Sequence, residues 1–307
     1  MIRSRMGKRR FLLLAIAAGI VLASGIPCLV FFTRAPVLVV SDVSFISLYG
    51  VGRARQQRLR SSLALFRPVK PVVIADDAGD DIALFAIGEA SSRPFCVLFP
   101  MRFADAAGLY KERFPEIPAI ILEGRAAAGG TGGEFFLLAT DMEADFYRAG
   151  LAAAILDGDK NGIILVLLED SMQNVGQAAF LRGLRDQGKA AEPLFFTSFS
   201  EISDLSGVSC VVLAGFGAEY LERNQEIPVI LFTWLNTDLV PQNTVLVFDD
   251  SPWAQAVQAS GMAVSRIKNG RIPSKTLILP AKVADKYILR KLNKAAGKKI
   301  KDWPCKV

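Results

Sequence analysis

Histidine is absent from this chain of 307 residues, and cysteine is scarce. Without an imidazole the chain cannot form a Ser-His-Asp or Cys-His catalytic set or an HExxH metal site. The cysteines Cys28, Cys96, Cys210 and Cys305 have no CxxC spacing, which argues against a zinc or redox site. Cys96 and Cys210 lie in apolar, strand-like runs and are expected to be buried. The sequence therefore predicts no metal and no cofactor, and it argues against an enzyme.

The central part of the chain has no excess of basic residues, and the sequence has no phosphate-binding loop. The formal net charge is +6, but the excess lies near the two ends, in residues 3–10 and 291–306. Because the body between them is near neutral, nucleic-acid binding is not predicted. The glycine-rich residues 129–133 precede a predicted strand, whereas the loops that bind nucleotides follow one.

One long apolar run stands near the N-terminus. Residues 11–32, FLLLAIAAGIVLASGIPCLVFF, carry no charge and are long enough to cross a bilayer as a helix. Basic residues precede the run and only Arg34 follows closely, so the N-terminus is expected in the cytoplasm. This pattern favours a single-pass anchor in the inner membrane, with the main domain periplasmic or extracellular. A signal peptide cut near residues 23–25, or a lipoprotein acylated at Cys28, would also export the remainder.

From residue 36 onward, short apolar runs alternate with helix-like stretches. This alternation is typical of parallel sheets covered by helices on both faces. Each half of the chain carries five such runs, which favours two similar α/β lobes over one large sheet. The predicted strands are residues 37–40, 71–75, 95–99, 119–122, 135–139, 163–168, 194–197, 210–214, 228–232 and 244–248.

Three helices are predicted in the intervals between strands. Residues 143–156 follow Asp141, which can cap a helix, and residues 172–187 form an amphipathic helix closed by Gly188. Ser251 and Pro252 suit the N-cap and the first position of the third helix.

Residues 140–188 resemble the middle region of the type I periplasmic binding proteins. In that family a strand ends at an acidic residue, and a Gly-Ala-rich helix, a strand and a helix with an Arg-x-x-Gly-like element follow. Here these features match Asp141, residues 149–153, residues 163–168 and residues 182–184. Residues 245–280 also resemble the family's return segment into the first lobe.

The resemblance implies two lobes that share one chain. Residues 1–34 are then a basic stub followed by the membrane anchor or signal. Residues 35–141 together with 271–285 make up the first lobe, and residues 142–270 make up the second. Residues 286–307 are left as a basic C-terminal tail.

In open α/β sheets, ligands bind at the carboxyl ends of the strands, and two hinged lobes turn that edge into a cleft. Carboxylate and amide groups there can bond hydroxyls, and aromatic faces can stack on a sugar or a base. A neutral polar ligand such as a sugar or nucleoside is therefore expected. The predicted ligand-binding residues are Asp42, Ser44, Phe45, Asp141, Asp170, Trp234, Asn236, Asp249 and Trp253.

Other roles stay open for three of these residues. Asp141 suits a helix cap equally well, Asp249 can favour the dipole of the helix that follows it, and Trp253 falls on the inward face of its helix.

The preferred function is an extracytoplasmic solute-binding protein that delivers its ligand to an ABC-type permease or a sensor. The alternative is a membrane-anchored module of the same fold that contacts another protein, in which the cleft would be filled by its own side chains. A glycosidase using Asp249 and Asp250 is disfavoured, because adjacent residues at one strand end rarely face the same substrate.

Overall fold

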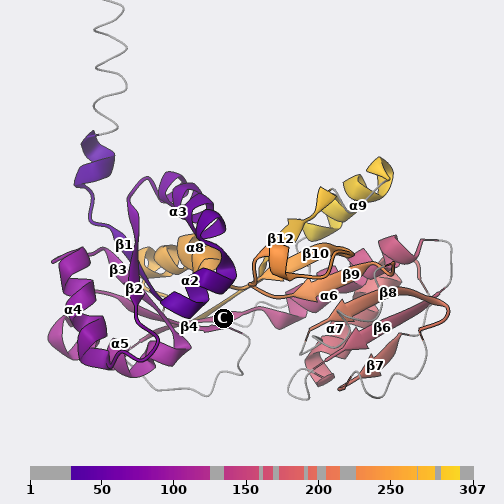
Figure 1. Ribbon diagram of the computed structural model, residues 1–307, viewed down its shortest axis with the longest axis horizontal. Helices are drawn as coiled ribbons and strands as arrows, with labels where there is room; N and C mark the ends of the chain where they lie inside the picture. Colours follow the sequence, from indigo (N-terminus) through magenta and orange to yellow (C-terminus); the bar gives the residue numbers. More distant parts are fainter. Residues whose placement is uncertain are drawn as a thin grey trace, which may run out of the picture.

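The computed structural model describes residues 29–124, 135–158, 162–168, 173–189, 193–198, 205–214, 226–267, 269–280 and 285–297. Within these residues, two six-stranded sheets form two lobes that lie side by side (Figure 1). The prediction of two lobes built on parallel sheets is confirmed.

The first lobe has an entirely parallel sheet in the order β11-β5-β4-β3-β1-β2. Alternate residues of β1 face opposite cores, because Val37 and Val39 belong to one buried cluster and Leu38 and Val40 to another. Helices α2, α3 and α8 cover the first face, and α4 and α5 cover the second. The strands are β1 (Val37–Asp42), β2 (Val69–Ile74), β3 (Cys96–Pro100), β4 (Ala119–Gly124), β5 (Phe136–Thr140) and β11 (Asn269–Ile272). The helices are α2 (Val43–Tyr49), α3 (Val51–Leu65), α4 (Asp80–Ala90), α5 (Ala104–Arg113) and α8 (Pro252–Ser265).

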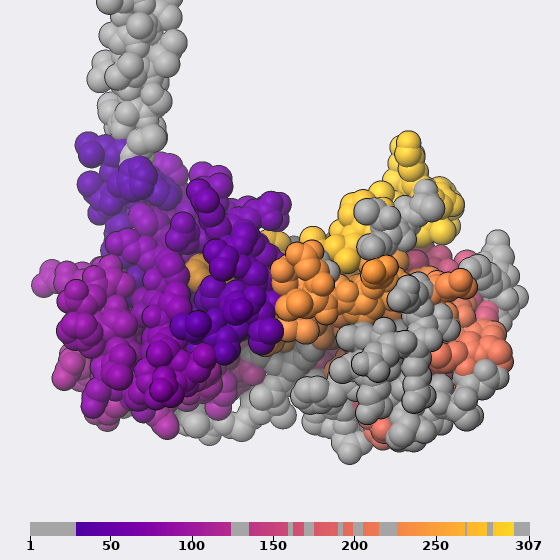
Figure 2. Space-filling view, viewed as in Figure 1, coloured from indigo at the N-terminus to yellow at the C-terminus, as the bar shows by residue number. Residues whose placement is uncertain are grey.

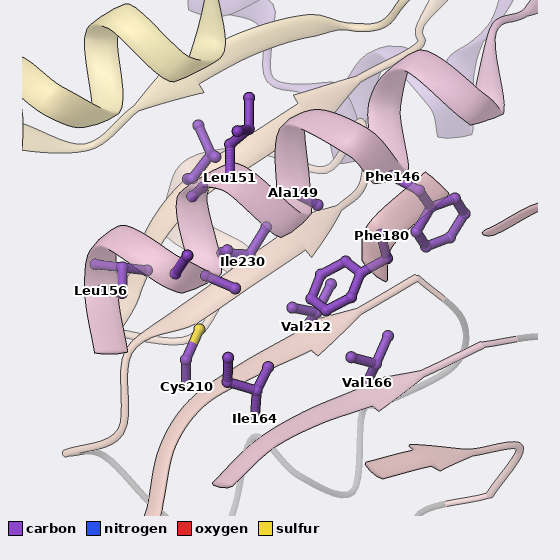
Figure 3. Packing of buried hydrophobic residues seen from close by; sticks show 14 of the residues in the cluster. Phe146, Ala149, Leu151, Leu156, Ile164, Val166, Phe180, Cys210, Val212 and Ile230 are labelled. Atoms are coloured by element: carbon purple, nitrogen blue, oxygen red, sulfur yellow. The ribbon is translucent and has the colours of Figure 1, made fainter. Parts of the chain in front are cut away.

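The second lobe has the sheet order β12-β10-β9-β8-β6-β7, and its β12 runs antiparallel to β10. Helices α6, α7 and α9 contribute side chains to its main core, where Phe146 of α6 and Phe180 of α7 lie over the valines and isoleucines of the sheet (Figure 3). The strands are β6 (Ile163–Leu167), β7 (Leu194–Phe196), β8 (Val208–Leu213), β9 (Val229–Phe232), β10 (Thr244–Asp249) and β12 (Lys275–Ile278). The helices are α6 (Met142–Asp157), α7 (Gln173–Asp186) and α9 (Lys286–Ala296).

Two glycines bring the backbones of α6 and α7 into direct contact. A Cβ atom built on Gly150 would lie 2.2 Å from the carbonyl oxygen of Phe180, and one on Gly183 would lie 2.2 Å from the carbonyl oxygen of Tyr147. Because only glycine lacks a Cβ, both positions require it at this helix spacing. The Gly-Ala-rich element noted in the sequence therefore serves close helix packing.

All ten predicted strands are present, and β11 and β12 are additional. The chain crosses between lobes three times, at residues 140–142, 249–252 and 272–275. Helix α8 thus packs on the first lobe, although its residues fall in the predicted second-lobe range of 142–270. Strand β12 belongs to the second sheet, although its residues fall in the predicted first-lobe range of 271–285. Helix α8 joins the first lobe because its apolar face buries Ala256 and Ala259 against the first sheet.

The residues predicted as a C-terminal tail begin with α9, which packs on α6 and buries Leu292 completely. Cys96 and Cys210 are fully buried free thiols, as predicted.

Among the described residues, none of the helices combines the length and apolarity needed to traverse a bilayer. The predicted membrane segment at residues 11–32, with Cys28, lies almost entirely outside them.

Candidate functional site

Polar side chains after β1, β2 and β3 form one network at the carboxyl edge of the first sheet. Asp42 accepts from the backbone N–H of Phe45 at 2.5 Å and pairs with Arg102 at 2.6 Å. Arg102 also donates to the carbonyl oxygen of Asp76 at 2.8 Å. Ser44 donates to the Asp76 carboxylate through its backbone N–H at 3.0 Å and its hydroxyl at 2.7 Å. These bonds from Ser44 hold the pKa of the Asp76 carboxyl below its ordinary value.

Aromatic rings from both lobes meet beside this network. The ring of Phe45, in α2, stacks on Tyr49 with centroids 5.4 Å apart. It also lies tilted against Trp234, which follows β9 of the second lobe, with centroids 4.7 Å apart. Two of the three aromatic residues predicted to bind a ligand, Phe45 and Trp234, therefore contact each other across the lobes.

Arg53 of α3 makes the main polar link between the lobes. Its guanidinium pairs with Asp249, at the end of β10, at 2.7 Å, and the two side chains are only 15% and 5% exposed. The same guanidinium donates to the carbonyl oxygens of Trp234 at 3.3 Å and Leu235 at 2.5 Å. The hydroxyl of Tyr49 donates to Asp249 at 3.2 Å. Burial and the nearby charge of Asp249 raise the pKa of Tyr49, so its hydroxyl stays a proton donor.

Gly50 lets the backbone of the second lobe approach between α2 and α3. Its φ of +90° suits glycine, and a Cβ atom there would lie 3.0 Å from Cγ of Asn236. The backbone N–H of Asn236 donates to the carbonyl oxygen of Leu48 at 2.8 Å. A larger residue at position 50 would strain the backbone and force the side chain of Asn236 to shift.

A cavity of about 480 Å³, named here the interlobe cavity, opens beside these contacts. Both lobes line it. Its polar lining includes Tyr49, Arg53, Gln57 and Arg60 from the first lobe and Asn236, Asp238, Asp249 and Lys275 from the second. Lys275 donates to the side-chain oxygen of Gln57 at 2.6 Å. The walls thus offer guanidinium, ammonium and amide donors together with two carboxylates, a set that can bond the hydroxyl groups of a polar ligand.

Four of the predicted ligand residues come together here. Asn236 and Asp249 line the cavity, and Phe45 and Trp234 contact each other next to it.

Four of the other five predicted residues lie elsewhere. Asp42 and Ser44 belong to the network at the first-lobe edge. Asp141 caps α6, accepting from the backbone N–H of the third residue of that helix at 3.1 Å. Trp253 is 1% exposed and packs in the first-lobe core. Asp170 lies outside the described residues.

Several cavity residues were not anticipated from the sequence. Arg53, Gln57 and Arg60 follow one another at steps of four and three residues, which places them on one face of α3, and Tyr49 is the last residue of α2. That periodicity marks a polar face, but nothing local to it identifies Lys275 as its neighbour. Among the described residues, no group of three or more cysteines and acidic residues is arranged to hold a metal ion.

No protein-family model and no curated protein matches the sequence of this chain. Solved structures do match. A transcriptional activator of the comK gene from Bacillus halodurans is similar at 14% identity, over 86% of this chain and 96% of that one, with a TM-score of 0.56. AraP, an arabinose-binding protein from Geobacillus stearothermophilus, is similar at 12% identity, over 80% of this chain and 96% of that one, with a TM-score of 0.52. At such identities the likeness establishes the fold alone, which is that of the type I periplasmic binding proteins, as the sequence resemblance implied.

Proposed function

We propose that this chain is an extracytoplasmic solute-binding protein that holds a small polar ligand in the interlobe cavity. The observation that carries the proposal is that both lobes supply polar side chains to one cavity of about 480 Å³. A ligand held there bonds Arg53 or Gln57 of the first lobe and Asn236 of the second at the same time. Its binding energy then favours one relative position of the lobes, as in hinged binding proteins.

The cavity suits a ligand rich in hydroxyl groups. Its volume falls within the range of about 300–1,000 Å³ that is usual for small-molecule sites. Donors and acceptors are both present on the wall, since Asn236 and Gln57 line it together with Asp238 and Asp249. A sugar of one or two rings or a nucleoside matches this chemistry, and a structural neighbour is described as an arabinose-binding protein. An enzymatic role gains no support, because the neighbours compared above are a binding protein and a regulator.

Export to the outer face of the inner membrane is part of the proposal. The uncharged residues 11–32, preceded by basic residues, support a retained single-pass anchor. The same segment favours transport or sensing over transcription, although one structural neighbour is a transcriptional activator. An ABC-type permease or a membrane sensor is the partner that such a location implies.

The ligand is tested by isothermal titration of the full chain with a panel of neutral sugars and nucleosides. At least one is expected to bind saturably, and Asn236→Ala is expected to weaken that binding about tenfold through loss of an amide that contacts the ligand. Asn293→Ala, on α9 and away from the cavity, is the matched control and should bind as the unaltered chain does. Silence across the whole panel would contradict the proposal.

A second function is favoured by one observation. Side chains that could bind a ligand already contact one another across the lobes: Phe45 packs on Trp234, and Arg53 pairs with Asp249. A module that uses this fold to contact a protein at the membrane would have such a self-filled site. Its signature is a silent titration together with one partner recovered repeatedly by crosslinking in membranes.

The location is tested by fractionation of cells that produce the full chain. The protein is expected in the membrane fraction after an alkaline wash, and external protease is expected to digest it in spheroplasts, because the lobes lie outside the cytoplasm. Release by the alkaline wash would exclude a retained anchor. Protection from protease in intact spheroplasts, followed by digestion after lysis, would exclude export.

A further inference from the structure

Buried polar atoms without a partner gather around a second cavity of about 420 Å³, named here the crossover cavity. Helices α3 and α8, Arg148 of α6 and the crossover residues 272–276 line it. Four lining residues each have a side-chain atom that lacks a hydrogen-bond partner: Ser61 Oγ, Arg148 Nε, Gln255 Oε1 and Ser274 Oγ. Their residues are at most 7% exposed. They account for four of the seven such atoms in the described part of the chain, so the vacant hydrogen-bonding capacity is concentrated at this cavity.

The charges on the wall have one sign. Arg60 and Lys275 line the cavity, and the described residues that line it include no aspartate or glutamate. Partial loss of hydration lowers the pKa of Lys275, and the neighbouring positive charge of Arg60 lowers it further. Arg148 is neutralised from behind by the fully buried Asp145. Arg60 and Lys275 therefore repel each other, the nearby carboxylate of Asp249 offsets part of that repulsion, and an anion would relieve the rest.

The cavity also touches both lobes and one of the three crossovers between them. Helices α3 and α8 belong to the first lobe, Arg148 belongs to the second, and Ser274 lies on the crossover between β11 and β12. Arg148 already donates to the carbonyl oxygens of Ser274 at 2.8 Å and Ala296 at 3.2 Å. In Figure 2 the outline of the molecule is lower between α3 and the region of β12. A molecule bound here contacts both lobes and one of the segments that join them.

We propose that the crossover cavity binds the oxyanion group of a small effector, either a phosphate or a carboxylate. Arg60 and Lys275 supply the charge at the exposed wall of the cavity. The unpaired hydroxyls of Ser61 and Ser274, the Nε–H of Arg148 and Oε1 of Gln255 are buried behind that wall, and a side-chain rotation on binding lets them bond the same molecule. The cavity shares Gln57, Arg60 and Lys275 with the interlobe cavity. Occupancy of the two cavities is therefore coupled, and the effector changes the affinity for the solute.

The probes are inorganic phosphate and succinate, each titrated against the full chain at constant ionic strength made up with potassium chloride. The melting temperature is expected to rise saturably with one of them, because a ligand that binds only the folded state stabilises it. The anion that acts identifies the group. Arg60→Gln and Lys275→Gln are each expected to weaken its apparent affinity at least tenfold, about the effect of losing one charge-assisted hydrogen bond.

Arg55→Gln is the matched control, since Arg55 is an exposed arginine of the same helix that does not line the cavity. It should bind the anion as the unaltered chain does. If the two charge variants fail to fold, Ser274→Ala, which keeps every charge, should still weaken binding severalfold. Absence of a saturable rise with both anions, or an equal loss in Arg55→Gln, would overturn the proposal. Asn236→Ala should leave anion binding unchanged, because Asn236 lines only the interlobe cavity. Anion binding is measured without sugar, so a failed sugar titration would not contradict this proposal.

Discussion

Gly183→Ala is expected to lower the free energy of unfolding by about 3 kcal/mol or more, the upper range for overpacking a tight contact. The new methyl group would lie 2.2 Å from the carbonyl oxygen of Tyr147, 2.9 Å from the backbone nitrogen of Leu151 and 3.0 Å from Cα of Gly150. All three are backbone atoms of α6, so no side-chain rotation can relieve the clash. The two helices would have to separate and expose the core around Phe180. Urea unfolding followed by circular dichroism measures the change.

Gly261→Ala provides the matched control for this prediction. Gly261 is also a helical glycine, in α8, and a Cβ atom there would have nothing within 4 Å. Its replacement should stabilise the chain by about 0.5–1 kcal/mol, because alanine has the higher helix propensity. If Gly183→Ala proved as stable as Gly261→Ala, the backbones of α6 and α7 would not approach each other this closely in solution.

Arg53→Ala is expected to lower the free energy of unfolding by about 3 kcal/mol, because it leaves a buried carboxylate without its charge partner. Asp249 is 3% exposed and would keep only the hydroxyl of Tyr49 and the backbone N–H of Ser251 as donors. The carbonyl oxygens after β9 would lose their donor as well. Because these bonds join the lobes, the change should also loosen their relative position, which small-angle scattering can detect.

Arg55→Ala is the control for the charge itself, since Arg55 is exposed on the same helix. Its effect should stay within about 0.5 kcal/mol, as for most surface substitutions. A double-mutant cycle of Arg53→Ala with Asp249→Asn isolates the pair, and a coupling energy of about 1–3 kcal/mol is expected for directly contacting residues. Additive effects of the two substitutions would show that the ion pair does not join the lobes in solution.

The strands could be predicted from the sequence wherever both faces of a sheet are covered. Residues 37–40 are uniformly apolar because alternate residues enter different cores, and residues 245–248 are likewise apolar and buried. Strands β11 (Asn269–Ile272) and β12 (Lys275–Ile278) escaped prediction because they are short and no residue in them is fully buried. They pair at the sheet edges, and that pairing depends on strands far away in the sequence.

The lining of the interlobe cavity likewise depends on contacts between residues far apart in the sequence. The rule that ligands bind at strand ends located Asn236 and Asp249, since both follow strands of the second sheet. It missed Arg53 and Gln57, which lie inside a helix and reach the cavity only because α3 faces β12. It also misplaced Trp253, for which the deciding factor is burial against the first sheet. Helical spacing shows which residues share a face of α3, but the residues that lie across the cavity from that face depend on tertiary structure.

The interleaving of the two lobes along the chain constrains how the protein can be made. The core that covers one face of the first sheet needs Trp253, Ala256 and Ala259 of α8, and the sheet itself is completed by β11. During synthesis from the N-terminus, strands β1 to β5 therefore emerge long before their covering helix, and the whole second-lobe segment from α6 to β10 intervenes. Until the last quarter of the chain arrives, the apolar side chains of Val37, Leu98 and their neighbours lack that cover, which leaves this face of the sheet prone to aggregation.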